Sequence, residues 1–283
     1  MKPVEPPMSG VDLHFLGTGG GRYVMTSQRR RTAGIRLEQG DSQVHIDPGP
    51  GALVFSNWAK LSPRKLDAVI VTHCHPDHYS DAEVFIEAMT NGTQTKQGLL
   101  AGTYSVLEGA DKIGPCISDY HKGLVRDLIT LERGTRFNVN DIAFTATEAR
   151  HSDPHTVGLT METSVGKIGY TGDTGYFKGV SEQYTDSRLL ILCTVWPRGN
   201  PISIHLNTDN ALKIIREAQP KACMLTHFGT RMLNGDPEAE AAYLEDETGI
   251  PVSAARDGMR VHISDGITLF SPRKTDPPKT IDA

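Results

Sequence analysis

The chain has 283 residues, of which 38% are hydrophobic and 22% charged, and its formal net charge is −5. This composition supplies enough apolar material for a sizeable core and excludes a disordered chain, a coiled coil and a collagen. The negative charge argues against a globally basic nucleic-acid surface. The four cysteines form no C-x-x-C pair and no secretory leader or membrane-length apolar run is visible, so we expect a cytoplasmic protein.

The ends of the chain differ from its middle in composition. Both ends are rich in proline, and no linker or internal repeat interrupts the residues between them. We therefore expect one domain over residues 11–270, with a flexible N-terminal tail over residues 1–10 and a flexible C-terminal tail over residues 271–283.

In the first half of the chain, apolar alternation predicts strands that lead toward a histidine-rich segment. A glycine-rich loop, 17–21, follows the first of these strands, and a helix is expected from Ser80. The expected strands cover 11–16, 34–38, 43–47 and 67–72, the second and third forming a hairpin.

In the second half, strands and helices alternate, and this order predicts an α/β (α+β) layered fold with αββα packing. Residues 91–134 carry the weakest pattern, with a strand near Leu99 and helices near Ser105 and Leu124 as hypotheses. Expected strands cover 136–139, 142–146, 156–162, 167–171, 189–194, 222–226, 260–264 and 267–270, and expected helices cover 207–218 and 237–247, the first capped by Asn207 or Thr208.

Four residues with metal-binding side chains lie within six positions after the strand over 67–72. His73 and His75 are two apart on an extended chain, so both imidazoles project to the same side. Pro76 then turns the backbone, and Asp77 and His78 can reach a neighbouring point. Imidazole and carboxylate without thiolate suit Zn²⁺, Fe or Mn²⁺ at an open site. A polar surface loop is the alternative interpretation.

The segment from His73 to His78 resembles the H-x-H-x-D-H signature of the metallo-β-lactamase superfamily, which implies an αββα sandwich with a binuclear metal site. Further histidines and an aspartate follow at matching places after later strands. The resemblance implies that His73, His75 and His151 hold one metal ion, that Asp77, His78 and His227 hold the second, and that Asp173 bridges them.

By this resemblance the chain is a metal-dependent hydrolase. Two divalent ions, Zn²⁺ with Mn²⁺ or Fe²⁺ as alternatives, would lie about 3.5–4 Å apart and share a hydroxide that acts as the nucleophile. Asp77, also a metal ligand, and His205 are the predicted catalytic residues. The Leu16–Gly19 opening and His205 resemble RNase Z and the cyclic-phosphate phosphodiesterases, where such a histidine would contact a phosphoryl oxygen or protonate the leaving group. A histidine that merely flanks a helix is the alternative for His205.

The stretch between His151 and Asp173 has only 21 residues, 152–172, and two expected strands consume them. The tRNA-binding arm of single-domain RNase Z enzymes has no room there, so a small phosphodiester or nucleotide-type substrate is favoured over long nucleic acid. A homo-oligomer is compatible with the sequence. The other hypotheses are a thioester or lactone hydrolase of the same fold and a non-catalytic metal-binding protein.

Three further residues are candidates for supporting roles. Asp47 is expected either to hydrogen-bond a metal-binding histidine or to form an Asp-Pro-Gly turn. Arg30 belongs to a basic cluster that either clamps a phosphate or forms a solvated surface. His155 is expected to lie in a loop or to contact substrate.

Overall fold

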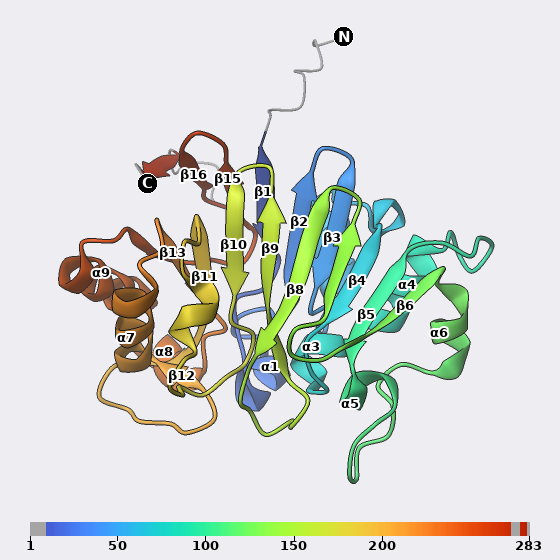
Figure 1. The fold of residues 1–283 in the computed structure, drawn as a ribbon, viewed down its shortest axis with the longest axis horizontal. Helices are drawn as coiled ribbons and strands as arrows, with labels where there is room; N and C mark the ends of the chain where they lie inside the picture. The colour runs from blue at the N-terminus through green and yellow to red at the C-terminus, as the bar shows by residue number, and fades with distance from the viewer. Residues whose placement is uncertain (1–9, 273–277, 282–283) are drawn as a thin grey trace.

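The computed structural model describes residues 10–272 and 278–281. Two β-sheets pack face to face, with helices along their outer sides (Figure 1). Helices α7 (Thr208–Ala218) and α9 (Pro237–Thr248) lie at one end of the sandwich, and α4 (Ala82–Met89) and α6 (Asp119–Leu124) lie at the other. The layered α/β arrangement predicted from the sequence is therefore confirmed.

The larger sheet has nine strands in the order β17-β16-β15-β1-β2-β3-β4-β5-β6. Strands β3 to β6 run parallel, and the other neighbours are antiparallel. Every residue of β4 is buried, as expected for a strand covered on both faces. The strands are β1 (Val11–Phe15), β2 (Ile35–Gln39), β3 (Ser42–Ile46), β4 (Ala68–Val71), β5 (Leu99–Thr103), β6 (Asp127–Leu131), β15 (Met259–Ile263), β16 (Ile267–Phe270) and β17 (Lys279–Ile281).

The second sheet follows the order β14-β13-β11-β10-β9-β8-β7, and the short strand β12 pairs with β11. Antiparallel hairpins form one half of this sheet and parallel strands the other. Its strands are β7 (Arg136–Val139), β8 (Ile142–Glu148), β9 (Val157–Thr163), β10 (Gly166–Tyr170), β11 (Leu189–Trp196), β12 (Leu206–Asn207), β13 (Cys223–Thr226) and β14 (Val252–Ala254).

The long helices α7 and α9 and the short helix α8 pack on the second sheet, and the short helices α2, α4, α5 and α6 pack on the outer side of the first. Helix α7 buries Ala211, Ile214 and Ile215, and Asn207 caps its start in a reciprocal hydrogen-bond pair with Asn210. Among the described residues, no helix is long and apolar enough to cross a bilayer. The helices are α1 (Arg22–Ser27), α2 (Ala52–Trp58), α3 (Pro76–Tyr79), α4 (Ala82–Met89), α5 (Tyr104–Leu107), α6 (Asp119–Leu124), α7 (Thr208–Ala218), α8 (Thr230–Asn234) and α9 (Pro237–Thr248), with 3₁₀ turns at Pro63–Lys65 and Ser181–Tyr184.

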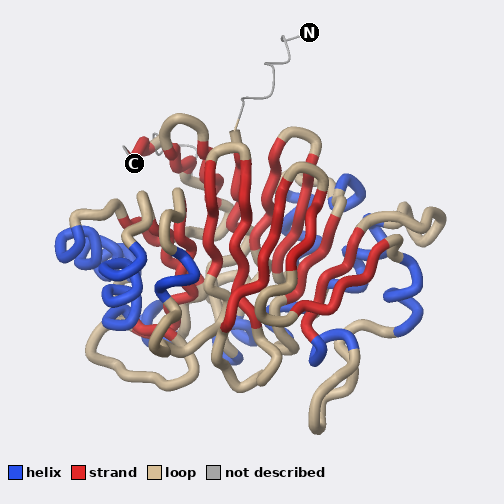
Figure 2. Tube along the Cα trace, in the orientation of Figure 1, coloured by secondary structure: helices blue, strands red, loops and turns tan. Residues whose placement is uncertain are grey.

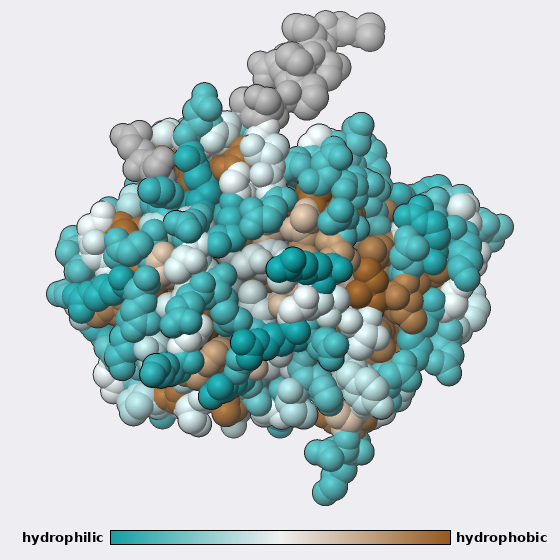
Figure 3. Space-filling view, in the orientation of Figure 1, coloured by the Kyte–Doolittle hydropathy of each residue, from teal (hydrophilic) through white to brown (hydrophobic). Residues whose placement is uncertain are grey.

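The main hydrophobic core lies between the two sheets. Alternate residues of the facing strands meet there, including Leu13 and Phe15 from β1 and Phe144 and Leu159 from the opposite sheet. Two smaller clusters lie under the helices on the outer sides. Figure 3 shows that hydrophilic side chains cover most of the visible face, and Figure 2 shows that loops gather along the lower edge of both sheets. Loops held by a rigid scaffold often carry binding or catalytic residues, so this edge is a candidate location for a functional site.

Two sequence predictions change at the weakly patterned parts of the chain. The stretch 91–134 contains the predicted strand and helices as β5, α5 and α6, but also the unpredicted edge strand β6. Within the expected C-terminal tail, β17 pairs with β16 and buries Ile281, so this part of the tail belongs to the sheet. Residues 1–9 of the expected N-terminal tail lie outside the described residues. The division into one domain and two tails otherwise stays a prediction.

The imidazole of His45 is buried against α4 and makes one hydrogen bond to the backbone. The ring of His45 packs against Phe85 with centroids 4.5 Å apart, and its Nε2–H donates to the carbonyl of Ala33. Burial, together with the positive charge of Arg36, lowers the pKa of His45 to about 3. The imidazole therefore stays neutral in the folded protein at pH values where an unfolded histidine takes up a proton.

This lowered pKa predicts a pH-dependent loss of stability. Between the ordinary pKa of 6.5 and about 3, the unfolded chain binds the proton and the folded chain does not, so stability falls as pH falls through this window. Within this window the free energy of unfolding changes by up to about 1.4 kcal/mol per pH unit. His45→Gln removes the titrating group, so the stability difference between wild type and variant should shrink from pH 7 to pH 4 in urea unfolding. A constant difference would contradict this assignment.

Candidate metal centre

The strand β4 delivers the histidine-rich segment to the lower edge of the sandwich, where α3 lies in Figure 1. His73 follows the strand and is fully buried, and His75 is the extended residue before the helix. Pro76 occupies the first turn of α3, where its missing N–H costs nothing. The single turn that follows buries Asp77 and His78 on the same side.

One group of donors gathers around His75. Its Nδ1 lies 3.1 Å from Nε2 of His73 and 3.1 Å from Nε2 of His151. Oδ2 of Asp173 lies 3.9 Å from the first and 3.7 Å from the second of these Nε2 atoms. Four donor atoms thus surround one point, and together they could hold a metal ion.

A second group lies on the other side of Asp173. Nε2 of His78 is 3.0 Å from Nε2 of His227, and Oδ2 of Asp77 is 3.4 Å from the latter. Oδ1 of Asp173 lies 3.2 Å from Nε2 of His227, and its Oδ2 lies 3.7 Å from Nε2 of both His78 and His151. The Asp173 carboxylate therefore stands between the two groups.

Asp47 holds the histidine-rich segment in place through hydrogen bonds to Thr72 and His78. Its carboxylate accepts hydrogen bonds from the backbone N–H and hydroxyl of Thr72, from Nδ1–H of His78 at 2.9 Å and from the hydroxyl of Tyr170 at 2.9 Å. Because Nδ1 of His78 is hydrogen-bonded to Asp47, Nε2 is the ring atom that faces the site. Asp47 has φ of 56°, a left-handed conformation that aspartate tolerates in turns. The bond to His78 is the contact expected from the first interpretation of Asp47, in which it hydrogen-bonds a candidate metal ligand.

His227 also has left-handed backbone, with φ of 61°, and the glycine-rich loop holds it in place. Gly19 pairs with Phe228 in a short bridge, and Gly20 N–H donates to the Phe228 carbonyl. A Cβ on Gly20 would lie 2.1 Å from Nδ1 of His227, so only glycine allows this close approach. The next N–H, of Gly21, donates to Asp77. The loop 17–21 is thus a support for two site residues.

Two further carboxylates, which the sequence analysis missed, fix the surrounding loops. Asp153 accepts from Cys74 N–H within the histidine-rich segment and from the Ser105 hydroxyl. Asp257 accepts from the N–H and the hydroxyl of Thr18. Neither residue stands in a recognisable motif, because each meets its partner only through the fold.

Burial and the close mixture of carboxylates and imidazoles shift the pKa values of the site residues. Burial alone would lower the pKa of His78, but the surrounding carboxylates, led by Asp47, raise it to about 10. Burial disfavours charge on Asp173, yet the imidazoles around it, led by His227, lower its pKa to about 2. Burial and the neighbouring imidazoles hold the pKa of His73 well below its ordinary value.

These donors fit divalent metal ions. Ligands about 2.0–2.1 Å from a tetrahedral ion lie roughly 3.4 Å from one another, close to the spacings of both groups. Among the described residues, only histidines lie within ion-pair distance of Asp77 and Asp173, and Oδ1 of Asp173 is buried without a hydrogen-bond partner. Buried carboxylates of this kind favour a bound cation.

His205 lies at the open side of the donor groups. Its Nδ1 is 3.6 Å from Oδ2 of Asp173, and its ring packs against that of His151. Burial lowers the pKa of His205 to about 4, although Asp173 opposes the shift. The imidazole is therefore neutral at pH 7 and suited to donating an N–H hydrogen bond. It also belongs to a donor set with Asp173 and His227, so its role is open to test.

A cavity of about 830 Å³ opens onto the donor groups and includes His75, His151 and His205 in its lining. Arg30 and His155 do not line it: Arg30 donates to Thr18, and His155 packs beside Tyr104 in a different depression. Arg231 and Trp196, which the sequence analysis did not single out, do line it.

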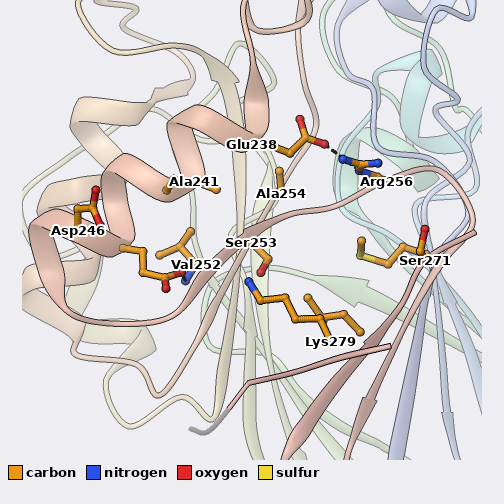
Figure 4. A pocket seen from close by; sticks show the side chains of 13 residues that line it. Glu238, Ala241, Asp246, Val252, Ser253, Ala254, Arg256, Ser271 and Lys279 are labelled. Carbon is orange, nitrogen blue, oxygen red and sulfur yellow. Dashed lines mark hydrogen bonds and ion pairs between the residues drawn. The ribbon is translucent and has the colours of Figure 1, made fainter. Parts of the chain in front are cut away.

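A second cavity, of about 420 Å³, lies between α9 and strands β14 to β17 (Figure 4). It contains none of the predicted site residues, and Glu238 and Arg256 at its edge already pair with one another at 2.8 Å. The metal-site candidates are therefore all outside this cavity.

Comparisons with known proteins agree with this geometry. The family described as "Beta-lactamase superfamily domain" matches residues 42–228. An uncharacterized protein of Methanocaldococcus jannaschii (MJ1374) is 36% identical over 258 residues, which cover 90% of this chain and 96% of the relative. Ribonuclease Z of Thermococcus kodakarensis is 37% identical over 79 residues, 28% of this chain and 24% of that enzyme. The metallo-beta-lactamase fold protein YhfI of Bacillus subtilis superposes with a TM-score of 0.72 at 18% identity, covering 90% of this chain and 99% of YhfI.

The contact between Gly20 and His227 predicts a metal-binding defect. Gly20→Ala places a methyl group against the imidazole and pushes it away, so affinity for added Zn²⁺ should fall about 10- to 100-fold. Gly123→Ala, whose Cβ would meet nothing within 4 Å, is the matched control. Metal content after dialysis, with circular dichroism as a check of folding, gives the answer. Equal metal retention in both variants would disprove the effect.

Proposed function

The chain belongs to the beta-lactamase superfamily, as a metal-dependent hydrolase of its RNase Z-like branch, and we propose that it is a binuclear phosphodiesterase. The observation that carries this proposal is the position of the Asp173 carboxylate between two groups of donor atoms. Its Oδ2 lies 3.7 Å from Nε2 of both His151 and His78, and its Oδ1 lies 3.2 Å from Nε2 of His227. One shared carboxylate between two such groups is the arrangement needed for a pair of neighbouring ions.

In this proposal His73, His75 and His151 hold one ion, Asp77, His78 and His227 hold the other, and Asp173 bridges them. When bound, two divalent ions, with Zn²⁺ favoured over Mn²⁺ or Fe²⁺, would supply a water of lowered pKa as nucleophile and Lewis acidity toward the phosphoryl oxygens. The protein fixes the donors through their outer ring atoms. Besides the bond from His78 to Asp47, His151 Nδ1–H donates to the Ile204 carbonyl at 2.7 Å.

His205 is the side chain proposed to contact the phosphoryl group. It lines the cavity beside Asp173, and its pKa of about 4 favours a neutral N–H donor over a proton shuttle at pH 7. A fixed donor of this kind stabilises charge that develops on a phosphoryl oxygen. The structure thereby favours the hydrogen-bonding role over protonation of the leaving group.

Small phosphodiesters are the favoured substrate class. The 79-residue likeness to a ribonuclease Z supports phosphodiester chemistry. Strands β9 and β10, with a tight turn at Ser164, occupy most of the stretch between His151 and Asp173, which leaves no protruding arm for a large RNA. A thioester or lactone hydrolase is the second candidate, because the same donors would serve carbonyl substrates.

A substrate panel tests the proposed function. The Zn²⁺- or Mn²⁺-loaded protein should hydrolyse bis(p-nitrophenyl) phosphate, and a chelator should abolish the activity because the ions supply the nucleophile. A thioester and a lactone are assayed beside it. Turnover of the carbonyl substrates alone would replace the phosphodiesterase with the second candidate. No turnover by fully loaded protein would favour a non-catalytic metal-binding protein.

The role of His205 is tested separately. His205→Ala should keep the metal content and lower phosphodiester turnover about 10²-fold, because it removes a hydrogen-bond donor to the reacting group. His155→Ala is the control, since this exposed histidine lies outside the cavity. Loss of metal from the His205 variant would identify it as a ligand, and unchanged turnover would remove it from the mechanism.

A further inference from the structure

The cavity beside the metal centre is wider than a phosphate requires. A cavity of about 830 Å³ is in the range that holds an entire small-molecule ligand. Most of its wall away from the donor groups is apolar or aromatic, although Tyr23 is 82% exposed and Ile204 is 41% exposed. These wall residues are Tyr23, Val24, Val195, Trp196, Ile202 and Ile204. A substrate that fills the space carries an apolar body next to its reacting group.

The charged residues of this wall all have one sign. Apart from Asp77, Asp173 and the histidines of the metal centre, the charged side chains among the described lining residues are Arg22 and Arg231. No described carboxylate forms an ion pair with either arginine, whereas Arg198, close by in the fold, pairs with Glu240. In a chain of net charge −5, two arginines without acidic partners around one cavity point to an anionic ligand.

The guanidinium of Arg231 is oriented by contacts with two neighbouring side chains, Trp196 and Asn200. Its guanidinium lies over the ring of Trp196, 4.2 Å from the centroid, and Nη1 donates to Oδ1 of Asn200 at 3.2 Å. Stacking on an aromatic face fixes the plane of the guanidinium while its remaining N–H groups stay available. This reduces the entropy lost when an anion binds.

We propose that Arg231, supported by Trp196, forms an anion subsite that binds a second negatively charged group of the substrate. The reacting phosphoryl group lies at the metal centre, and the apolar wall contacts the part of the substrate between the two charges. The substrate class is therefore a phosphodiester that carries a further phosphate or carboxylate beyond an apolar spacer. This inference rests on the proposed function only in placing the first anion at the metal ions.

Trp196 provides a direct reporter for binding. The chain has two tryptophans, so Trp58→Phe leaves Trp196 as the single tryptophan, and Trp58 is 71% exposed on α2, outside the cavity lining. The Zn²⁺-loaded protein is titrated with a series of linear alkane diphosphonates and with alkyl monophosphonates of matched length. A diphosphonate of suitable length should bind about tenfold more tightly than its monophosphonate partner, because charge-assisted hydrogen bonds to Arg231 form only with the second group.

Two variants in this background locate the effect. Arg231→Gln should abolish the preference for the diphosphonate. Arg198→Gln, which also removes a guanidinium stacked on an aromatic ring, that of Tyr243, but outside the cavity lining, should retain it. A preference that persists without Arg231, or disappears without Arg198, overturns the proposal, as does equal binding of the two probes by the parent protein. Because this readout does not depend on turnover, a protein that hydrolyses only carbonyl substrates yet keeps the preference would refute the phosphodiesterase and support the subsite.

Discussion

The site depends on one buried carboxylate, that of Asp47, which joins the two sheets. Asp47 follows β3 in the nine-stranded sheet, and it accepts hydrogen bonds from Thr72 beside β4 and from Tyr170 at the end of β10 in the other sheet. Its fourth hydrogen bond orients His78. Loss of any one of these four donors leaves part of a buried carboxylate unsatisfied and lowers stability. The same hydrogen bonds therefore support the packing of the two sheets and the orientation of a candidate metal ligand.

Much of the fold and the segment from His73 to His78 could be predicted from local signals in the sequence, whereas His151, Asp173 and His227 became candidates only through the family resemblance. The segment from His73 to His78 carries four donors within a few residues, and α7 has both a regular apolar face and a capping residue at Asn207. The strand β6 escaped prediction because Asp127 and Leu128 on this edge strand are exposed, so the apolar alternation is weak. β17 is short and follows a proline-rich stretch, which hid its pairing with β16.

The supporting residues of the site escaped prediction for a different reason. Asp153 and Asp257 each meet their partners across long stretches of chain, at sequence separations of 79 and 239 residues. Arg231 becomes distinctive only where Trp196 and Asn200 surround it. Sequence patterns report spacing along one element, whereas these roles arise from contacts between elements. The donor residues of the candidate centre could therefore be proposed from the sequence, whereas the contacts proposed to select a substrate could not.

The contact between the glycine-rich loop and the turn at His227 bears on how the protein is made. His227 lies 149 residues after His78, and its turn is held by a loop that precedes α1. The second group of donors consequently remains incomplete until β13 has been synthesised and has joined the sheet, whereas the first group needs no residue beyond Asp173. An ion held by the second group would therefore bind after the first group has been synthesised. The metal that occupies the centre would reflect which ions the compartment offers to the finished fold, because affinity alone discriminates poorly among first-row divalent ions.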